Sequence, residues 1–295
     1  MTGVSVTSPT NTRSVLARMR AARRRPVLIV GLICLGVPFI AAEIVQLIES
    51  RNAIQLGAYG FGAGPTSSHL LGTDGDGRDV LAMLAYGMRP TLDIGLVAGA
   101  TAAIIGTALG LISGYVRGAI DWLIRGVSDV LLGLPVLPIL IVVAAFIGSV
   151  SVGSLGLIIG LLSWPFTTRV VRAQALSMRE APYIESARLA GASPAGILGL
   201  EMLPNLLPFV VAGFVGAVSA AILASVGLQI LGLGTFGTPT LGLMLESAYE
   251  GGALSRGMWW WWGPPTVLLV IVFIGLFLVS LAVDEIANPR LRKQP

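Results

Sequence analysis

Three carboxylates in a glycine-rich segment are the residues in this sequence best suited to bind an ion. The segment reads Gly72-Thr73-Asp74-Gly75-Asp76-Gly77-Arg78-Asp79. A calcium loop of the EF-hand type also requires a glycine at its sixth position and a glutamate at its end, and that spacing is absent here. Gly and Asp adopt tight turns at little conformational cost. The segment therefore favours a structured turn over a calcium site.

The sequence lacks the residues of a nucleotide-binding or metalloenzyme site. A Walker A loop needs a lysine to bind phosphate, and the only lysine is Lys293, in the C-terminal tail. One histidine, His69, and one cysteine, Cys34, argue against a zinc or haem site built by this chain alone. We therefore expect a protein that is not an enzyme and binds no cofactor itself. If it uses ATP, another polypeptide must hydrolyse the nucleotide.

A polar segment near residues 179–204 carries the signals of two short, capped helices. Residues 180–190 are good helix formers, with Pro182 tolerated in the first turn. Gly191 stands where a helix ends in a left-handed residue, and Ser193 with Pro194 fits the start of a second helix running toward Leu203. The pattern predicts two helices joined by a sharp bend, a docking element for a partner that supplies energy. An ordinary charged surface loop is the alternative.

Long apolar stretches must position these polar segments. Hydrophobic residues make up 55% of the chain and charged residues 12%, against roughly 25% charged in a soluble domain. About 20 apolar residues span the hydrocarbon core of a bilayer, where the backbone must satisfy its own hydrogen bonds, so such runs form helices. The sequence predicts an all-α integral membrane protein with six transmembrane helices at residues 27–48, 92–115, 130–150, 155–171, 206–233 and 267–283.

The distribution of basic residues predicts the orientation of these helices. With six spans and the Arg-rich tail at residues 1–26 in the cytoplasm, the tail at residues 285–295 is cytoplasmic too. Of the 19 Lys and Arg residues, all but Arg51, Arg78, Arg89 and Arg256 then lie inside, as the positive-inside rule requires. The net charge of +4 therefore reflects topology and attraction to anionic lipid, without a nucleic-acid partner. The run at 27–48 is longer than a signal-peptide core, so we expect it to be retained.

Three features of the apolar stretches bear on how the helices are held. The tryptophans at 259–262 cannot share one helix face, and we expect them to anchor the sixth span at the membrane interface, with substrate stacking as the alternative. Glu43 is costly in a bilayer and should reach the interface or pair within the bundle. Glycines at four-residue spacings in the second stretch allow close helix packing: Gly95, Gly99, Gly106, Gly110 and Gly114.

Three segments resemble a known family. The run Glu185-Ser186-Ala187, followed by Gly191 and by Leu203-Pro204, is similar to the EAA loop of bacterial ABC importer permeases, with Ser186 in place of the middle alanine and Glu201 where isoleucine is usual. Residues 69–80 and 86–92 resemble the LGTDxxGRD segment of C-type permeases of dipeptide, oligopeptide and nickel importers. The ending at 288–292 is similar to their DPRLR tail, with asparagine for aspartate. The resemblance covers the whole chain and is weakest at 235–258.

The resemblance implies a type I ABC importer permease fold in the cytoplasmic membrane. The N-terminal helix at 27–48 and an extracytoplasmic loop at 49–91 would precede a core of five helices at 92–284, with a cytoplasmic coupling loop at 176–204. The expected partners are a homologous B-type permease, two cytoplasmic ATPases that bind ATP and Mg, and an extracytoplasmic substrate-binding protein. The ATPase-coupling residues would be Glu185, Ser186, Ala187, Gly191 and Pro204. The outer-face segment, which would meet the binding protein or stabilise the entrance, comprises Gly72, Thr73, Asp74, Gly77, Arg78 and Asp79.

The expected function is passage of dipeptides and oligopeptides through half of an ATP-driven translocation pathway. A permease for nickel or another small solute is the alternative within this class. An ATP-independent transporter or channel is an alternative from another class, although Glu43 alone approaches the mid-membrane charge that such proteins use. A scaffold for membrane assembly would leave the capped polar segment unexplained.

Overall fold

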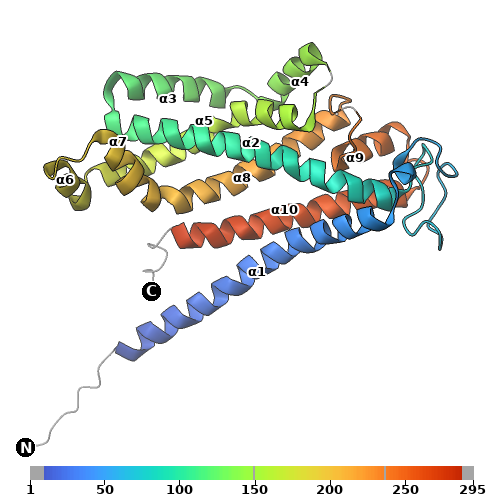
Figure 1. The fold of residues 1–295 in the computed structure, drawn as a ribbon, viewed down its shortest axis with the longest axis horizontal. Helices are drawn as coiled ribbons and strands as arrows, with labels where there is room; N and C mark the ends of the chain where they lie inside the picture. The colour runs from blue at the N-terminus through green and yellow to red at the C-terminus, as the bar shows by residue number, and fades with distance from the viewer. Residues whose placement is uncertain (1–9, 149, 236, 288–295) are drawn as a thin grey trace, which may run out of the picture.

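The chain folds into helices packed side by side along one direction (Figure 1). The structure, a computed structural model, describes residues 10–148, 150–235 and 237–287. Within these ranges there is no β-strand, and the tail motif at 288–292 lies outside them. The helices are α1 (Thr10–Ile48), η1 (Arg51–Ile54), α2 (Val80–Val116), α3 (Gly118–Gly133), α4 (Val136–Ile147), α5 (Val152–Arg179), α6 (Pro182–Leu189), α7 (Pro194–Gly196), a π-helix η2 (Ile197–Met202), α8 (Leu203–Ile230), α9 (Leu241–Glu250) and α10 (Trp259–Ala287).

Five helices of the described chain are long and apolar enough to cross a membrane, and a bent pair makes up to six. The five segments are Pro26–Ile48, Val80–Val116, Val152–Arg179, Pro194–Ile230 and Trp259–Val283. The bundle has two ends: α6 and α7 lie at one, which we call the α6 end, and the segment 49–79 with α9 lies at the other, which we call the loop end (Figure 1). Helix α1 begins and α10 finishes toward the α6 end.

Several helices run beyond the predicted spans, among them α2 and α5, which polar residues extend. Helix α2 begins at Val80 rather than at 92, so the first loop is 49–79. Asp79 starts it by accepting a hydrogen bond from the N–H of Ala82 at 3.0 Å, an N-cap that satisfies an otherwise free backbone donor. Helix α5 runs on to Arg179 rather than ending at 171. Helical structure therefore continues beyond the apolar runs that the hydropathy pattern detects.

The third predicted span, at 130–150, is a broken pair rather than one helix. Helices α3 and α4 meet at 86°. The break lies at Leu134, which is extended with φ −89° and ψ 136°. A residue that precedes proline is pushed out of the helical region, and Pro135 follows Leu134. The local signal for the break, Pro135, was therefore present in the sequence within a continuous apolar run.

Helix α2 lies in the middle of the bundle, and its glycines allow two neighbours to approach it. A Cβ placed on Gly95 would lie 2.7 Å from Ile222 of α8, and one on Gly110 would lie 2.8 Å from Val171 of α5. Close packing of small residues holds membrane helices together where the hydrophobic effect does not. The glycines predicted to pack thus serve two faces of α2, one against α5 and one against α8.

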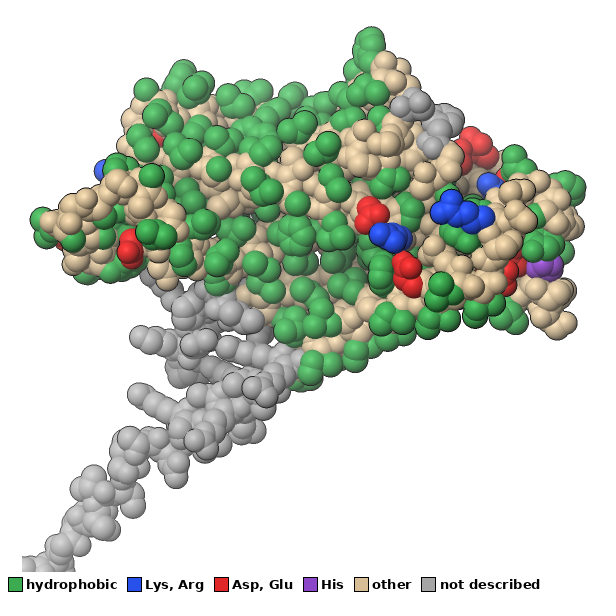
Figure 2. All heavy atoms as spheres, in the orientation of Figure 1, with side chains coloured by type: hydrophobic (Ala, Val, Ile, Leu, Met, Phe, Trp, Pro, Cys, Tyr) green, Lys and Arg blue, Asp and Glu red, His purple; other side chains and the backbone are tan. Residues whose placement is uncertain are grey.

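The outer surface of the bundle is mostly apolar between its ends. Figure 2 shows hydrophobic side chains over most of the visible middle, with one small group of charged side chains right of the centre and others toward the ends. Large apolar residues such as Leu157, Phe166 and Phe277 are exposed there. An apolar surface of this extent fits the hydrocarbon core of a membrane. Glu43 is half-buried on α1, in its last two turns.

Candidate functional site

The polar segment at the α6 end forms a short helix with a defined stop. Pro182 occupies the first turn of α6, where its missing N–H costs nothing. The N–H of Gly191 donates to the carbonyl of Arg188 at 3.0 Å, and the N–H of Ala192 donates to that of Ala187 at 3.0 Å. This hydrogen-bond pair is a Schellman motif, and Gly191 has the left-handed φ of 82° that it requires. The predicted helix and its glycine stop are therefore confirmed.

The second predicted helix begins as expected and continues without a break into α8. Ser193 caps it, since its hydroxyl accepts a hydrogen bond from the N–H of Gly196 at 3.1 Å. The helix then widens into η2, where the N–H of Leu203 donates to the carbonyl of Leu198, and runs directly into α8. Pro204 lies in the first turn of α8 and cannot donate to the preceding turn. The wider π turn joins the two helices at the point where that hydrogen bond is lost.

One apolar side chain fixes α6 to the rest of the protein. Ile184 is 0% exposed. It packs in a cluster with Leu111 of α2, Val171 of α5 and Leu206 of α8, and Ala187 packs against the same cluster. The guanidinium of Arg188 lies 5.2 Å from the ring centre of Tyr115, at the end of α2. Helix α6 therefore lies nearest η2 and α5, and it is joined to α2 and α8 through this shared cluster and the Arg188–Tyr115 contact.

The opposite face of α6 is open. Glu185 and Ser186 are exposed, and the side chain of Leu189 is 84% exposed at the helix end. Gly191 is exposed as well, and a Cβ placed on it would touch nothing within 4 Å. Of the residues predicted for coupling, Glu185, Ser186, Gly191 and Pro204 thus lie on the surface, whereas Ala187 turns toward the bundle. Sequence reasoning did not single out Ile184 or Leu189.

Glu201 lies close enough to α6 to affect its chemistry. Burial raises the pKa of the Tyr183 hydroxyl above its ordinary value, and the negative charge of Glu201 raises it further. Both effects favour the neutral hydroxyl of Tyr183, which is exposed on α6. The unusual glutamate in this motif is thus part of the surface around the helix.

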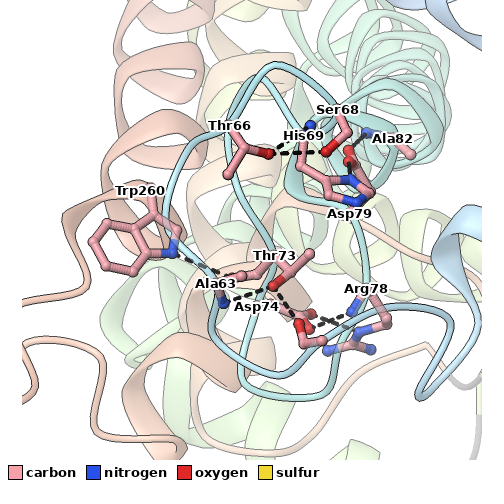
Figure 3. A network of polar contacts seen from close by, with 11 residues as sticks. Ala63, Thr66, Ser68, His69, Thr73, Asp74, Arg78, Asp79, Ala82 and Trp260 are labelled. Carbon is pink, nitrogen blue, oxygen red and sulfur yellow. Dashed lines mark hydrogen bonds and ion pairs between the residues drawn. The ribbon is translucent and has the colours of Figure 1, made fainter.

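At the loop end, the segment 72–79 forms a closed network (Figure 3). Thr73 is fully buried; its hydroxyl donates to the carbonyl of Gly60 at 2.6 Å and accepts from the N–H of Ala63 at 2.8 Å. The carboxylate of Asp74 accepts from the N–H and from the Nε of Arg78, at 2.8 and 2.6 Å. Buried polar groups need such partners because leaving them unpaired is costly. Thr73 and Asp74 therefore fix the fold of this loop.

Each remaining charge of the segment also has a structural partner. Arg78 pairs with Asp76 at 2.6 Å in addition to Asp74. Asp79 caps α2 and lies 2.8 Å from Nδ1 of His69. Arg78 and Asp79 therefore do not pair with each other but with neighbouring residues. Gly72 and Gly77 have left-handed φ values of 70° and 75°, which glycine adopts without strain.

One of the four tryptophans hydrogen-bonds to this network, and a second packs beside it. The Nε1 of Trp260 donates to the carbonyl of Thr73 at 3.2 Å (Figure 3). Trp261 is buried with Ala248, Ala253 and Met258. Trp259 is exposed at the start of α10. Successive helical residues point about 100° apart, so a run of four must send some rings inward. The run therefore holds the start of α10 against the loop. The anchoring at the membrane interface stays a prediction.

A comparison with family models places most of this architecture in one family. Residues 106–293 match the model described as "Binding-protein-dependent transport system inner membrane component". The chain belongs to this family. This binding-protein-dependent inner membrane component is thus a multi-pass membrane protein of a transport system, and the match includes the segment that carries α6.

Relatives and a solved structure agree with this assignment. The oligopeptide transport system permease protein OppC of Lactococcus lactis subsp. cremoris is 32% identical over 226 residues, 76% of either chain. The dipeptide transport system permease protein DppC of Haemophilus influenzae is 34% identical over 75% of either chain. A chain of the MetNI methionine ABC transporter, in inward-facing conformations, matches with a TM-score of 0.54 at 21% identity, over 72% of this chain and 97% of that one. The fold is therefore that of a type I ABC importer permease.

Proposed function

We propose that this permease forms half of the pathway by which an ATP-driven importer moves short peptides into the cytoplasm. The relatives named for oligopeptide and dipeptide transport support the peptide class. Its partners would be a second, homologous permease, two ATPases that bind ATP and Mg, and a binding protein outside the membrane. The basic N-terminal tail supports a cytoplasmic α6 end under the positive-inside rule.

The attachment of α6 through Ile184 is the observation that carries this proposal. Because Ile184 is buried in a cluster that includes residues of α2, α5, η2 and α8, a displacement of α6 would be passed to the long helices through that cluster. On the other face, the exposed Leu189 and Glu185 provide a surface that could bind in a cleft of an ATPase. Helix α6 thus has one face for the partner and one for the pathway.

In this mechanism, binding of ATP stabilises a closed ATPase dimer and so brings the two α6 elements of the permease pair together. The long helices follow, and the cavity between the two permeases turns outward. Hydrolysis returns the assembly to its inward-facing state. A ligand can shift such an equilibrium only by binding one state more tightly than the other. Helix α6 provides the link through which this difference in affinity reaches the membrane.

Replacement of Gly191 tests the coupling role. Valine rarely adopts a φ of 82°, so Gly191→Val should distort the end of α6. The matched control is Gly199→Val, because Gly199 is also exposed with free space around it but has helical backbone. Gly191→Asn should retain most activity, because asparagine tolerates the left-handed region.

The measurement uses the complete importer in proteoliposomes, with uptake of a short peptide and ATPase stimulation by the loaded binding protein. Gly191→Val should lose both while its membrane insertion is unchanged, and Gly199→Val should keep both. Full uptake and stimulation by Gly191→Val would overturn the coupling role of α6. A wild-type complex that moves no peptide would overturn the assigned substrate class.

A further inference from the structure

An ion pair on the outside of the bundle has no role in the mechanism above. It joins Asp129 of α3 to Arg169 of α5, with Nη2 of the arginine 2.7 Å from Oδ1 of the aspartate. The side chain of Asp129 is 64% exposed and that of Arg169 is 60% exposed. Both charges therefore meet whatever surrounds the folded chain at this depth.

The pair lies well along the length of the bundle, away from the α6 end. Thr167, two residues before Arg169, meets Gly106 of α2, because a Cβ on that glycine would lie 2.5 Å from Thr167. Gly106 is ten residues from the end of α2 at Val116, and Asp129 is eleven residues from the start of α3. With a rise of about 1.5 Å per residue, both counts place the pair roughly 15 Å from the α6 end. The hydrocarbon core of a bilayer is about 30 Å thick, so a core that begins at this end has the pair near its middle.

Helix α3 has two kinds of outer surface on the way to this depth. Leu123, Val127 and Val130 are exposed and apolar, and they recur at helical spacing along one side. Arg125 and Asp129 are exposed and charged, one turn apart on another side. Leu123 and Val127 lie closer to the α6 end than Asp129 does, so the apolar surroundings of α3 begin before the pair is reached. The pair is therefore not part of the polar ends of the bundle.

Lipid is an unfavourable neighbour for these charges. Ionised side chains within transmembrane segments are costly, and they face the bundle interior or a water-filled cavity. The interior of this chain is excluded, because both side chains are more than half exposed. A second exposed pair, Arg89 with Asp93 on α2, lies roughly 35–40 Å from the α6 end of that helix and so beyond a core about 30 Å thick. The pair of Asp129 and Arg169 thus needs water beside it within the membrane.

We propose that Asp129 and Arg169 line the water-filled passage between this permease and its homologous partner, in the half that opens at the α6 end. This assignment rests on the function proposed above. Charges stop at the pair, since residues 130–168 contain no Asp, Glu, Lys or Arg. The wall of the passage is therefore charged from the α6 end to its middle and uncharged from there to the loop end. A short peptide carries an ammonium and a carboxylate group, and the pair presents a charge of the opposite sign to each.

The arrangement of the helices agrees with this side as the wall of the passage. Helices α3 and α4 lie on one side of the bundle, opposite α1 and α10 (Figure 1). On the α10 side, Phe277 is 61% exposed and is ten residues from the end of the helix at Ala287. Its depth therefore matches that of the ion pair, at roughly 15 Å from the end of the helix. An apolar ring thus faces outward on one side of the bundle at the depth where the other side carries charges.

The test measures how fast single cysteines react with a membrane-impermeant thiol reagent, a trimethylammonium methanethiosulfonate, in the complete importer in nanodiscs. Cys34→Ser removes the native cysteine of this chain, and the mass of the permease reports its modification. The thiolate is the reactive form, and an apolar environment disfavours it. Without nucleotide, Asp129→Cys should therefore react about tenfold faster or more than Phe277→Cys, the control of matched depth.

The nucleotide state and transport give two further readouts. Trapping the ATPases with ATP and vanadate should turn the passage outward and slow the reaction of Asp129→Cys by about tenfold. Modification of Asp129→Cys should also block uptake of trialanine into proteoliposomes. Arg125→Cys, one turn nearer the α6 end, should follow the same pattern, and it replaces Asp129→Cys if that variant does not assemble.

Each other result overturns a stated part of the argument. If Asp129→Cys reacts as slowly as Phe277→Cys, lipid or the partner permease covers the pair and the inference is wrong. A fast reaction that trapping does not change, or uptake that survives modification, would place the pair at the polar boundary of the membrane and also overturns it. Uptake of trialanine by the unmodified wild-type importer is measured in parallel. A wild type that moves no peptide, together with a trap-dependent reaction at Asp129→Cys, would overturn the peptide class and leave the passage in place.

Discussion

The guanidinium of Arg172 holds the carboxylate of Asp121 with two hydrogen bonds across 51 positions of sequence. Nε lies 2.5 Å from Oδ1 and Nη2 lies 2.8 Å from Oδ2. The hydroxyl of Ser113 donates to the same Oδ1 at 2.5 Å. The carboxylate therefore joins α2, α3 and α5. Asp121 and Ser128 are the residues of α3 that are buried, and the apolar side chains of this helix largely face outward. An ion pair, rather than an apolar face, thus fixes α3 to the bundle.

Asp121→Asn should destabilise the protein by about 2 kcal/mol, because it leaves Arg172 largely buried without its counter-charge. This value is lower than for a fully buried pair, since solvent reaches part of both side chains. The measurement is thermal unfolding in detergent or nanodiscs. The matched control is Asp129→Asn, which breaks the pair with Arg169 between the same two helices. Both of those side chains are more than half exposed, so the expected loss is under about 1 kcal/mol. Equal losses for the two variants would contradict the role assigned to Asp121.

Gly75→Ala should loosen the loop end. A Cβ at this position would overlap the buried ring of Trp261, which cannot move away without disturbing α10. We expect the segment 49–79 to become several-fold more sensitive to protease, while the spans remain folded. Gly60→Ala is the control, because a Cβ there meets nothing within 4 Å. Limited proteolysis of the two variants and the wild type gives the comparison; unchanged cleavage of Gly75→Ala would show that Trp261 does not fix this loop.

The parts of the fold that local chemistry determines could be predicted from the sequence, and the parts that depend on distant contacts could not. The residue types of Gly191 and Ser193 favour the conformations that they adopt, so the caps of α6 and α7 could be predicted. The packing of the loop end depends on Trp261 meeting Gly75, nearly two hundred residues away, and no local pattern reports that contact. The break between α3 and α4 is an intermediate case. Its signal, Pro135, is local, but a hydropathy average over the surrounding apolar residues does not detect it.

Glu246 should make the stability of the loop end depend on pH. Its pKa is raised in the folded protein above the ordinary value of 4.5, chiefly by burial, with Glu250 and Asp76 adding to the rise and Arg78 opposing it. The folded state then binds the proton more tightly than the unfolded state. The stabilisation is fully present below the ordinary pKa and is lost as pH rises through the raised one. Because glutamine stays neutral, Glu246→Gln should gain stability relative to wild type as pH increases.

Thermal unfolding of Glu246→Gln and wild type between about pH 4 and pH 7.5 measures this effect. The difference in Tm should grow with pH in favour of the variant. A difference that is constant with pH would mean that Glu246 titrates alike in the folded and unfolded states.

Leu189→Ser should lower the affinity of the ATPase for the permease without destabilising the permease itself. The side chain is 84% exposed at the end of α6, so its removal leaves no cavity in the folded chain. Burying a leucine at an interface contributes roughly 1.5–3 kcal/mol, and we expect the Kd for the ATPase to rise by about tenfold or more. Leu56→Ser is the control, because Leu56 is 75% exposed at the opposite end of the bundle.

Pull-down titration of the purified ATPase onto each permease gives the affinities, and thermal unfolding shows whether the fold is intact. If Leu189→Ser binds the ATPase as tightly as Leu56→Ser does, the exposed end of α6 is not the docking surface, and the partner must contact the permease elsewhere.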